Sequence, residues 1–89
     1  MNDPWPHLLA HKVQTCIDSL APEVREHVRE TVRDILDIAG RNPWGWPQWD
    51  DTDPEGEDIR CASVGKVVLV YSINRARRHL YGFKLTYLP

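Results

Sequence analysis

The sequence has 89 residues with a formal net charge of −2, and 42% of them are hydrophobic, which suits a single folded domain over residues 1–89 and excludes a chain disordered throughout. No apolar run approaches the roughly 18 residues that span a bilayer, and no signal peptide opens the chain, so we expect a cytoplasmic protein with no membrane partner. The charge is divided unevenly, because residues 59–89 carry six bases and no acid, whereas residues 1–58 carry all 13 acids, and the basic part predicts an anionic partner.

The N-terminal part predicts two amphipathic helices. Pro4 and Pro6 favour an irregular segment over the first seven residues. Apolar residues then recur at intervals of three and four, which predicts a helix over residues 8–20. A second helix is predicted over residues 22–39, because Pro22 suits the first helical position and Gly40 suits the position after the last turn. The short connection between the helices predicts an antiparallel helical hairpin.

Residues 41–58 predict a long loop, because three prolines, two glycines and six acids disfavour regular structure. Trp44, Trp46 and Trp49 lie in this loop. We expect them to fold back onto the core, since tryptophan buries a large apolar area, and stacking on nucleic-acid bases is the alternative. The acids are expected to be solvated.

Residues 59–88 predict three antiparallel strands. Residues 59–64 lead into a tight turn at Gly65 and Lys66, and residues 67–71 are apolar on both faces, as in a central strand. Residues 80–88 alternate. The predicted fold class is α+β, with an N-terminal helical hairpin packed on a three-stranded antiparallel sheet.

The alternation in the last strand assigns its side chains to two faces. One face is expected to pack on the helices and holds four residues (Tyr81, Phe83, Leu85 and Tyr87). The other face holds Lys84 and is expected to be open to solvent or to a ligand.

Motifs for metal or cofactor chemistry are not found, and we expect neither a metal nor a cofactor. His7 and His11 are four residues apart, but no further metal-ligand pattern accompanies them. Cys16 and Cys61 are isolated and are interpreted as buried thiols in a reducing compartment, with one disulfide between them as the open alternative.

The polar residues with the clearest potential for chemistry lie on the predicted sheet and its loops (Arg60, Arg75, Arg77, Arg78, His79 and Lys84). Arginine binds phosphate in bidentate fashion, and histidine transfers protons near neutral pH. The alternative interpretation, a solvated basic turn, stays open.

Two segments carry a pattern known from a toxin family. Residues 20–36 begin with Leu-x-Pro-Glu-Val-Arg, and residues 58–88 contain Arg-x-x-x-Val-Gly and an apolar strand that ends in Tyr-x-Ile. This pattern resembles the RelE/ParE superfamily, the toxins of bacterial type II toxin–antitoxin modules. The resemblance implies an α+β fold with a helical hairpin against an antiparallel sheet, which is also what the residues predict.

The resemblance implies one of two activities and an antitoxin protein as partner. RelE-like members are metal-independent endoribonucleases that cleave mRNA on the ribosome, where the 2′-OH attacks the adjacent phosphate. This reaction needs a base, an acid and cationic groups. ParE-like members inhibit DNA gyrase. For the first activity the candidate catalytic residues are Arg60, His79, Lys84 and Tyr87, and the candidate nucleic-acid contacts are Lys66, Arg75, Arg77 and Arg78.

Departures from the family pattern motivate a second hypothesis, a non-catalytic binding module on the same fold. Val68 stands where the family often has arginine, and the strand that normally precedes the helices is not evident between Met1 and His7. Such a module would be a gyrase inhibitor or a protein-interaction domain. A third hypothesis is that the acidic run 50–58 folds over the basic sheet as an internal mimic of an acidic partner.

Overall fold

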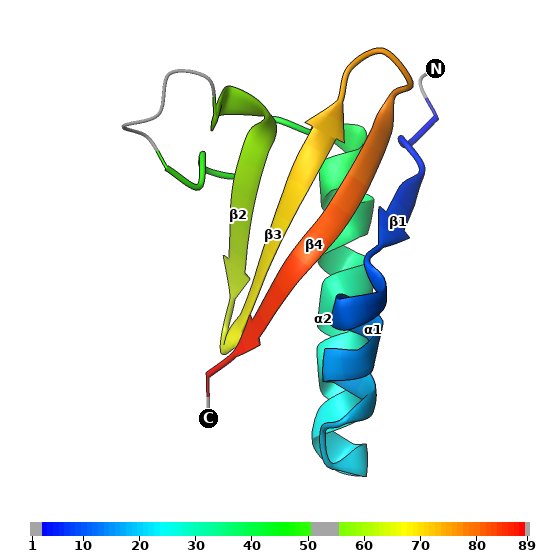
Figure 1. Ribbon diagram of the computed structural model, residues 1–89, viewed down its shortest axis with the longest axis vertical. Coiled ribbons are helices and arrows are strands. Elements are labelled where there is room, and N and C mark those ends of the chain that lie inside the picture. Colours follow the sequence, from blue (N-terminus) through cyan, green and yellow to red (C-terminus); the bar gives the residue numbers. More distant parts are fainter. Residues whose placement is uncertain (1–2, 51–55, 89) are drawn as a thin grey trace.

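The computed structural model describes residues 3–50 and 56–88. Part of the predicted acidic loop, residues 51–55, therefore lies outside the described residues. The elements in chain order are β1 (His7–Leu9), α1 (His11–Asp18), α2 (Pro22–Arg41), a 3-10 helix (Gly56–Asp58), β2 (Ile59–Val64), β3 (Val67–Asn74) and β4 (His79–Tyr87), and Figure 1 shows their arrangement.

The strands form a four-stranded mixed sheet in the order β1-β4-β3-β2. The α+β class is confirmed, but the prediction of a three-stranded antiparallel sheet is wrong, because β1 adds a fourth strand parallel to β4. Backbone hydrogen bonds to β4 hold the chain at both ends of β1. The N–H of Leu80 donates to Pro6 at 3.0 Å, and the N–H of Ala10 donates to Gly82 at 2.8 Å. A strand of three residues is too short to show alternation, so the sequence pattern could not reveal it.

The short strand also displaces the first helix. The predicted helix over residues 8–20 is reduced to α1, because Leu8 and Leu9 belong to β1 and Ala10 is the residue before the helix. Val13 and Ile17 form the buried face of α1, as the helical spacing predicted. The prediction of an N-terminal helical hairpin is corrected, because the strand β1 precedes both helices and α1 is much shorter than α2.

Helix α2 begins at Pro22, as predicted, but it continues past Gly40 to Arg41. The prediction that Gly40 ends the helix is wrong. Gly40 lies inside the last turn, where its carbonyl accepts a 2.9 Å hydrogen bond from the N–H of Trp5. A Cβ at this position would lie 3.0 Å from the Trp5 carbonyl oxygen. Glycine is therefore explained by the close approach of the N-terminal segment to the helix.

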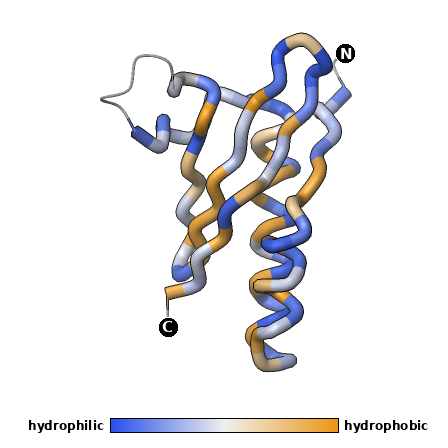
Figure 2. The backbone as a smooth tube through the Cα atoms, in the orientation of Figure 1, coloured by the Kyte–Doolittle hydropathy of each residue, from blue (hydrophilic) through white to orange (hydrophobic). Residues whose placement is uncertain are grey.

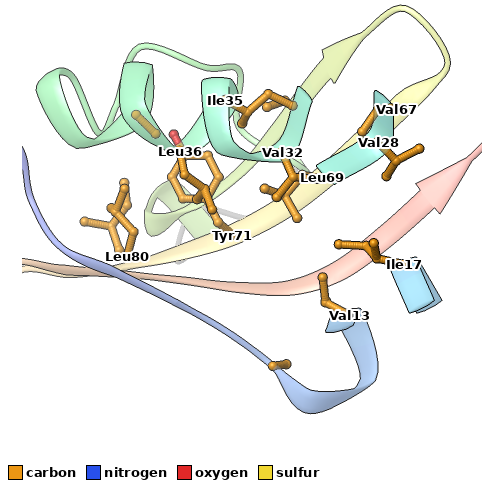
Figure 3. Packing of buried hydrophobic residues seen from close by; sticks show 14 residues of the cluster. Val13, Ile17, Val28, Val32, Ile35, Leu36, Val67, Leu69, Tyr71 and Leu80 are labelled. Carbon is orange, nitrogen blue, oxygen red and sulfur yellow. The ribbon is translucent and has the colours of Figure 1, made fainter. Parts of the chain in front are cut away.

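The core lies between the helices and one face of the sheet (Figure 3). Tyr71 is at its centre with 0% exposure, and Figure 3 shows it near Leu36 and Leu80. Its hydroxyl donates a 2.6 Å hydrogen bond to the carbonyl of Pro43. Burial raises the pKa of Tyr71 to about 12. This contact attaches the chain that leaves α2 to the middle of the sheet.

A β-bulge interrupts the pairing of β3 with β4. Val70 pairs with Lys84, but the next residue, Tyr71, pairs with Gly82, so Phe83 is the extra residue. Because a bulge places consecutive residues on nearly the same side, the alternation of β4 is reset at this point.

The reset changes which β4 side chains face the helices. Phe83, Leu85 and Tyr87 pack against the core as predicted, but beyond the bulge Leu80 is the buried residue, with 0% exposure. The predicted position of Tyr81 is wrong, because it is 45% exposed on the opposite face of the sheet. Phe83 stacks on Tyr81, with ring centroids 6.5 Å apart.

The tight turn at Gly65 and Lys66 is confirmed, and Gly65 has a φ of 58° at the first turn position, where glycine is favoured. Cys16 on α1 and Cys61 on β2 are half-buried free thiols. Among the described helices, none has the length and apolar character needed to cross a membrane.

Candidate nucleic-acid interface

The predicted basic residues are distributed over both ends of the sheet. Lys66 lies in the β2–β3 turn, and the β3–β4 turn at the opposite end holds Arg75, Arg77 and Arg78 (Figure 1). Figure 2 shows that this second turn is largely hydrophilic. The structure therefore does not gather these residues into one patch.

The candidate catalytic residues are also divided between the two faces. Arg60 pairs with Tyr71 across β2 and β3, so its side chain starts on the helix side, where its Nη1 donates to the carbonyl of Trp46 at 3.1 Å. Tyr87 packs against the core on the same side. Lys84 and His79 lie on the other face, where their partners Val70 and Asn74 are four residues apart on β3, which corresponds to about 13 Å of strand.

Arg75 is held by the end of the long loop. Its Nε donates to Oδ2 of Asp58 at 2.9 Å and its Nη2 donates to Oδ1 at 2.8 Å. Its guanidinium also lies 4.9 Å from the centre of the Trp44 ring. Trp44 Nε1 donates to the same carboxylate at 3.0 Å. These hydrogen bonds, first of all those from Arg75, hold the pKa of Asp58 below its ordinary value.

We call the face of the sheet opposite the helices the open face. A group of aromatic rings lies on it beside Lys84. The ring centroid of Trp49 is 6.3 Å from that of Phe83, in an edge-on arrangement, and Phe83 in turn stacks on Tyr81. Lys84 Nζ lies 5.2 Å from the centre of the Trp49 ring. Trp49 and Tyr81 remain 49% and 45% exposed, so their rings are accessible.

Two local features bring these rings together. Residues 47–49 run along the edge of β2, with Trp49 N–H donating to Ile59 at 3.0 Å and Cys61 N–H donating to Pro47 at 2.8 Å. This pairing carries Trp49 from the loop to the open face. The β-bulge turns Phe83 and Lys84 to the same side, so that both contact Trp49.

The three tryptophans therefore have different positions. Trp44 and Trp46 pack against the core, as predicted, and Trp44 meets Trp5 edge-on at 5.7 Å. Trp49 lies on the open face instead.

Val70 also lies on the open face. It points away from the helices, and it is nevertheless only 2% exposed.

Comparison with known proteins shows which fold this arrangement belongs to. The sequence matches no protein-family model and no curated protein. Solved structures of toxins do match the fold. A chain of the RelBE2 toxin–antitoxin complex of Mycobacterium tuberculosis matches with a TM-score of 0.69 and 15% identity, covering 96% of this chain and 99% of that chain.

Two further structures agree. The isolated RelE toxin of E. coli matches with a TM-score of 0.65 and 13% identity, covering 96% of this chain and 85% of that chain. A chain of the archaeal RelE–RelB complex of Pyrococcus horikoshii OT3 matches with a TM-score of 0.61 and 20% identity, covering 96% of this chain and 96% of that chain. The chain has the RelE toxin fold.

Within this RelE fold, one part of the sequence interpretation is corrected and one departure from the family pattern is located. The strand that precedes the helices is present as β1, which begins at His7, the last residue of the segment where no strand was evident, and ends at Leu9. Val68, which replaces the arginine that the family often has, pairs with Thr86 on the open face. That part of the RelE-like sheet therefore carries no cation from β3.

Sequence reasoning missed the Trp49, Phe83 and Tyr81 group. The available signal was Gly82, since a glycine inside a strand often marks a bulge. Recognising the bulge would have placed Tyr81 on the open face. The position of Trp49 depends on pairing at the β2 edge, for which the loop sequence carries no periodic signal.

Proposed function

We propose that this chain is a RelE-like toxin that binds single-stranded RNA on the open face and acts by occupying its target rather than by cleaving it. The observation that carries the proposal is the contiguous group of Trp49, Phe83 and Tyr81 beside Lys84. The proposal keeps the toxin class that the fold supports and favours the non-catalytic alternative within it.

Aromatic rings on an open sheet suit single-stranded RNA. Unpaired bases stack on such rings, and each stacked base contributes about 1–3 kcal/mol. Lys84 next to the rings supplies a positive charge for a neighbouring phosphate. Residues 59–88 contain no acid, so the strands β2 to β4 place no carboxylate against the RNA.

The separation of the candidate catalytic groups supports binding over cleavage. Cleavage by the 2′-OH needs a base and an acid within hydrogen-bond reach of one phosphate. Arg60 and Tyr87 start on the helix side of the sheet, whereas Lys84 and His79 lie on the open face about 13 Å of strand apart. A cleavage site would require these groups to move together.

An antitoxin is the proposed partner. One of the matching structures is a toxin–antitoxin complex by name, and another is a RelE–RelB complex. The open face and its edge expose Leu8 at 65% and Tyr81 at 45%, which gives a partner apolar surface to cover. A small neighbouring gene whose product co-purifies with this chain and suppresses its toxicity would support the pairing.

The binding proposal is tested with a fluorescently labelled single-stranded RNA. Trp49→Ala and Lys84→Ala should each weaken binding, Trp49→Ala by about tenfold because one stacked base is lost. Trp49→Phe keeps a ring and should bind nearly as wild type. Lys12→Ala removes an exposed lysine on α1 and is the charge control. Equal affinity of all variants would contradict the proposal.

The mode of action is tested by expressing the chain alone in a bacterium. Growth arrest with intact mRNA and reduced translation is expected, and Trp49→Ala should restore growth. Cleaved mRNA on ribosomes would establish the endonuclease instead. DNA damage with normal translation would indicate gyrase as the target.

A further inference from the structure

A cleft of about 770 Å³ lies beside the β3–β4 turn, between that turn, the N-terminal segment and the end of α2. Arg77 and Arg78 of the turn line it together with Arg41 from the last turn of α2. The aromatic residue Trp5 and one acidic residue, Asp3, also line the cleft. Two distant parts of the sequence, the end of α2 and the β3–β4 turn, thus bring three arginines to one concave surface.

Two of these arginines have no acidic partner within the described residues. Arg41 forms only a long, exposed contact with Asp37, with Nε and Oδ2 3.6 Å apart. Arg77 and Arg78 form no ion pair with any described carboxylate, unlike Arg75 of the same turn, which binds Asp58. Three cations against the single carboxylate of Asp3 leave the cleft positive, and such a cleft attracts anions.

The backbone of the turn gives a second, independent indication. Arg78 has a φ of 55°, the left-handed region that glycine normally occupies. The preceding part of the turn is held by Asn74, whose Oδ1 accepts a 3.0 Å hydrogen bond from the N–H of Arg77. An arginine at a strained position is evidence that its side chain is needed there, since glycine would adopt this conformation without strain.

We infer that this arginine cleft is a phosphate-binding site for the backbone of RNA. Guanidinium groups bind phosphate oxygens in bidentate fashion. Phosphate is favoured over a small carboxylate because three arginines surround a space large enough for a nucleotide unit. Trp5, which is half-buried, offers a ring edge or face to the adjoining base.

The inference rests on the proposed RNA binding and extends it beyond the open face. Asn74 and His79 pair at the base of the turn, on the side of the sheet where Lys84 lies. An RNA strand that crosses the open face toward this end of the sheet therefore meets the turn next. The arginine cleft would hold the strand where it leaves the sheet.

The test compares RNA affinity over a range of salt concentrations. Arg77→Ala, Arg78→Gly and Arg41→Ala should each weaken binding of a labelled single-stranded RNA three- to tenfold at low salt. Each lost phosphate contact should also reduce the slope of log affinity against log salt by about 0.7. Arg33→Ala removes an exposed arginine of α2 outside the cleft and is the matched control. Arg78→Gly places glycine at a φ of 55°, which glycine adopts without strain, and a urea denaturation curve of the variant separates a loss of binding from a loss of folding.

A second measurement separates this inference from the proposed function. Inorganic phosphate is titrated while the side-chain NMR signals of Arg41, Arg77 and Arg78 are followed. Shifts in these signals support the cleft even if RNA does not bind the open face. If RNA binding depends on Trp49 but is equal in the wild type, Arg77→Ala and Arg78→Gly, the inference is overturned and the proposed function stands. If phosphate shifts no arginine signal and the salt slopes are unchanged, the cleft is not a phosphate site.

Discussion

Asp58 and Arg75 form a bidentate ion pair that joins the end of the long loop to the β3–β4 turn, with donor–acceptor distances of 2.9 and 2.8 Å. Trp44 adds a third hydrogen bond to the same carboxylate at 3.0 Å. The last acid of the run 50–58 thus neutralises one base of the sheet. Since residues 51–55 lie outside the described residues, the hypothesis that the whole run screens the basic surface stays a prediction.

Asp58→Asn should lower the free energy of unfolding at pH 7 by about 1 kcal/mol, because the pair is partly exposed and solvent screens it. The lowered pKa of Asp58 means that its stabilisation is present above the unfolded pKa of about 3.9 and is lost as pH falls through the folded pKa. The difference between wild type and variant in thermal melts should therefore shrink below about pH 4. Asp34→Asn, on the exposed face of α2, is the control; an undiminished difference at low pH would contradict the assignment.

Tyr71→Phe should lower the free energy of unfolding by about 1–2 kcal/mol, measured by urea denaturation. The substitution leaves the ring in place but removes the hydroxyl that donates to Pro43. The Pro43 residue is buried, so its carbonyl would lose a partner that water cannot easily replace. Tyr81→Phe removes an exposed hydroxyl and should change stability by less than about 0.5 kcal/mol. Similar losses in both variants would show that the Pro43 contact contributes nothing.

Gly40→Ala should lower stability although alanine favours helices. The new Cβ would lie 3.0 Å from the Trp5 carbonyl oxygen and 3.3 Å from its nitrogen. Overpacking of this kind costs about 1–3 kcal/mol, against a gain of about 1 kcal/mol in helix propensity. Hydrogen exchange should accelerate at the amides of Trp5 and Leu80, which hold the N-terminal segment. Glu30→Ala, on the exposed side of α2, is the control for helix propensity alone. Unchanged hydrogen exchange at Trp5 and Leu80 in Gly40→Ala would contradict the close approach as the reason for glycine.

Arg78→Gly should raise the free energy of unfolding by about 0.5–1 kcal/mol, because glycine adopts a φ of 55° without the clash that an L side chain makes. Arg77, in the same turn, does not have a positive φ, so glycine relieves no strain there. Arg77→Gly should therefore lower the free energy of unfolding, since glycine increases the entropy of the unfolded chain. Urea denaturation of both variants gives the comparison. A destabilised Arg78→Gly would mean that the arginine side chain stabilises the turn.

The elements that the sequence predicted well are those in which many residues repeat one pattern. The stripe of Val28, Val32, Ile35 and Leu36 marks α2, and all four are buried. The strands β2 and β3 are confirmed with the turn at Gly65 between them. In these segments the burial of many apolar side chains determines the secondary structure, so the spacing of apolar residues predicts the element correctly.

The candidate site was predicted less well, because its geometry depends on single contacts. The bulge at Phe83 moved Tyr81 to the open face, and edge pairing with β2 moved Trp49 to the same place. Arg75 was predicted as a nucleic-acid contact, but it binds Asp58, from 17 residues earlier in the chain. Neither a one-residue insertion nor an ion pair between distant residues leaves a periodic signal.

By itself the sequence determined the α+β class, the buried stripe of α2, the strands β2 to β4 and the basic character of the C-terminal third. These properties follow from composition and from apolar residues repeated at helical or strand spacing. Only the tertiary structure decided that β1 joins β4, that the open face carries Trp49 beside Lys84, and that Arg41 meets Arg77 and Arg78 in one cleft. Those relationships arise where segments far apart in the chain approach within a few ångströms, and backbone pairing and side-chain fit at each contact determine them.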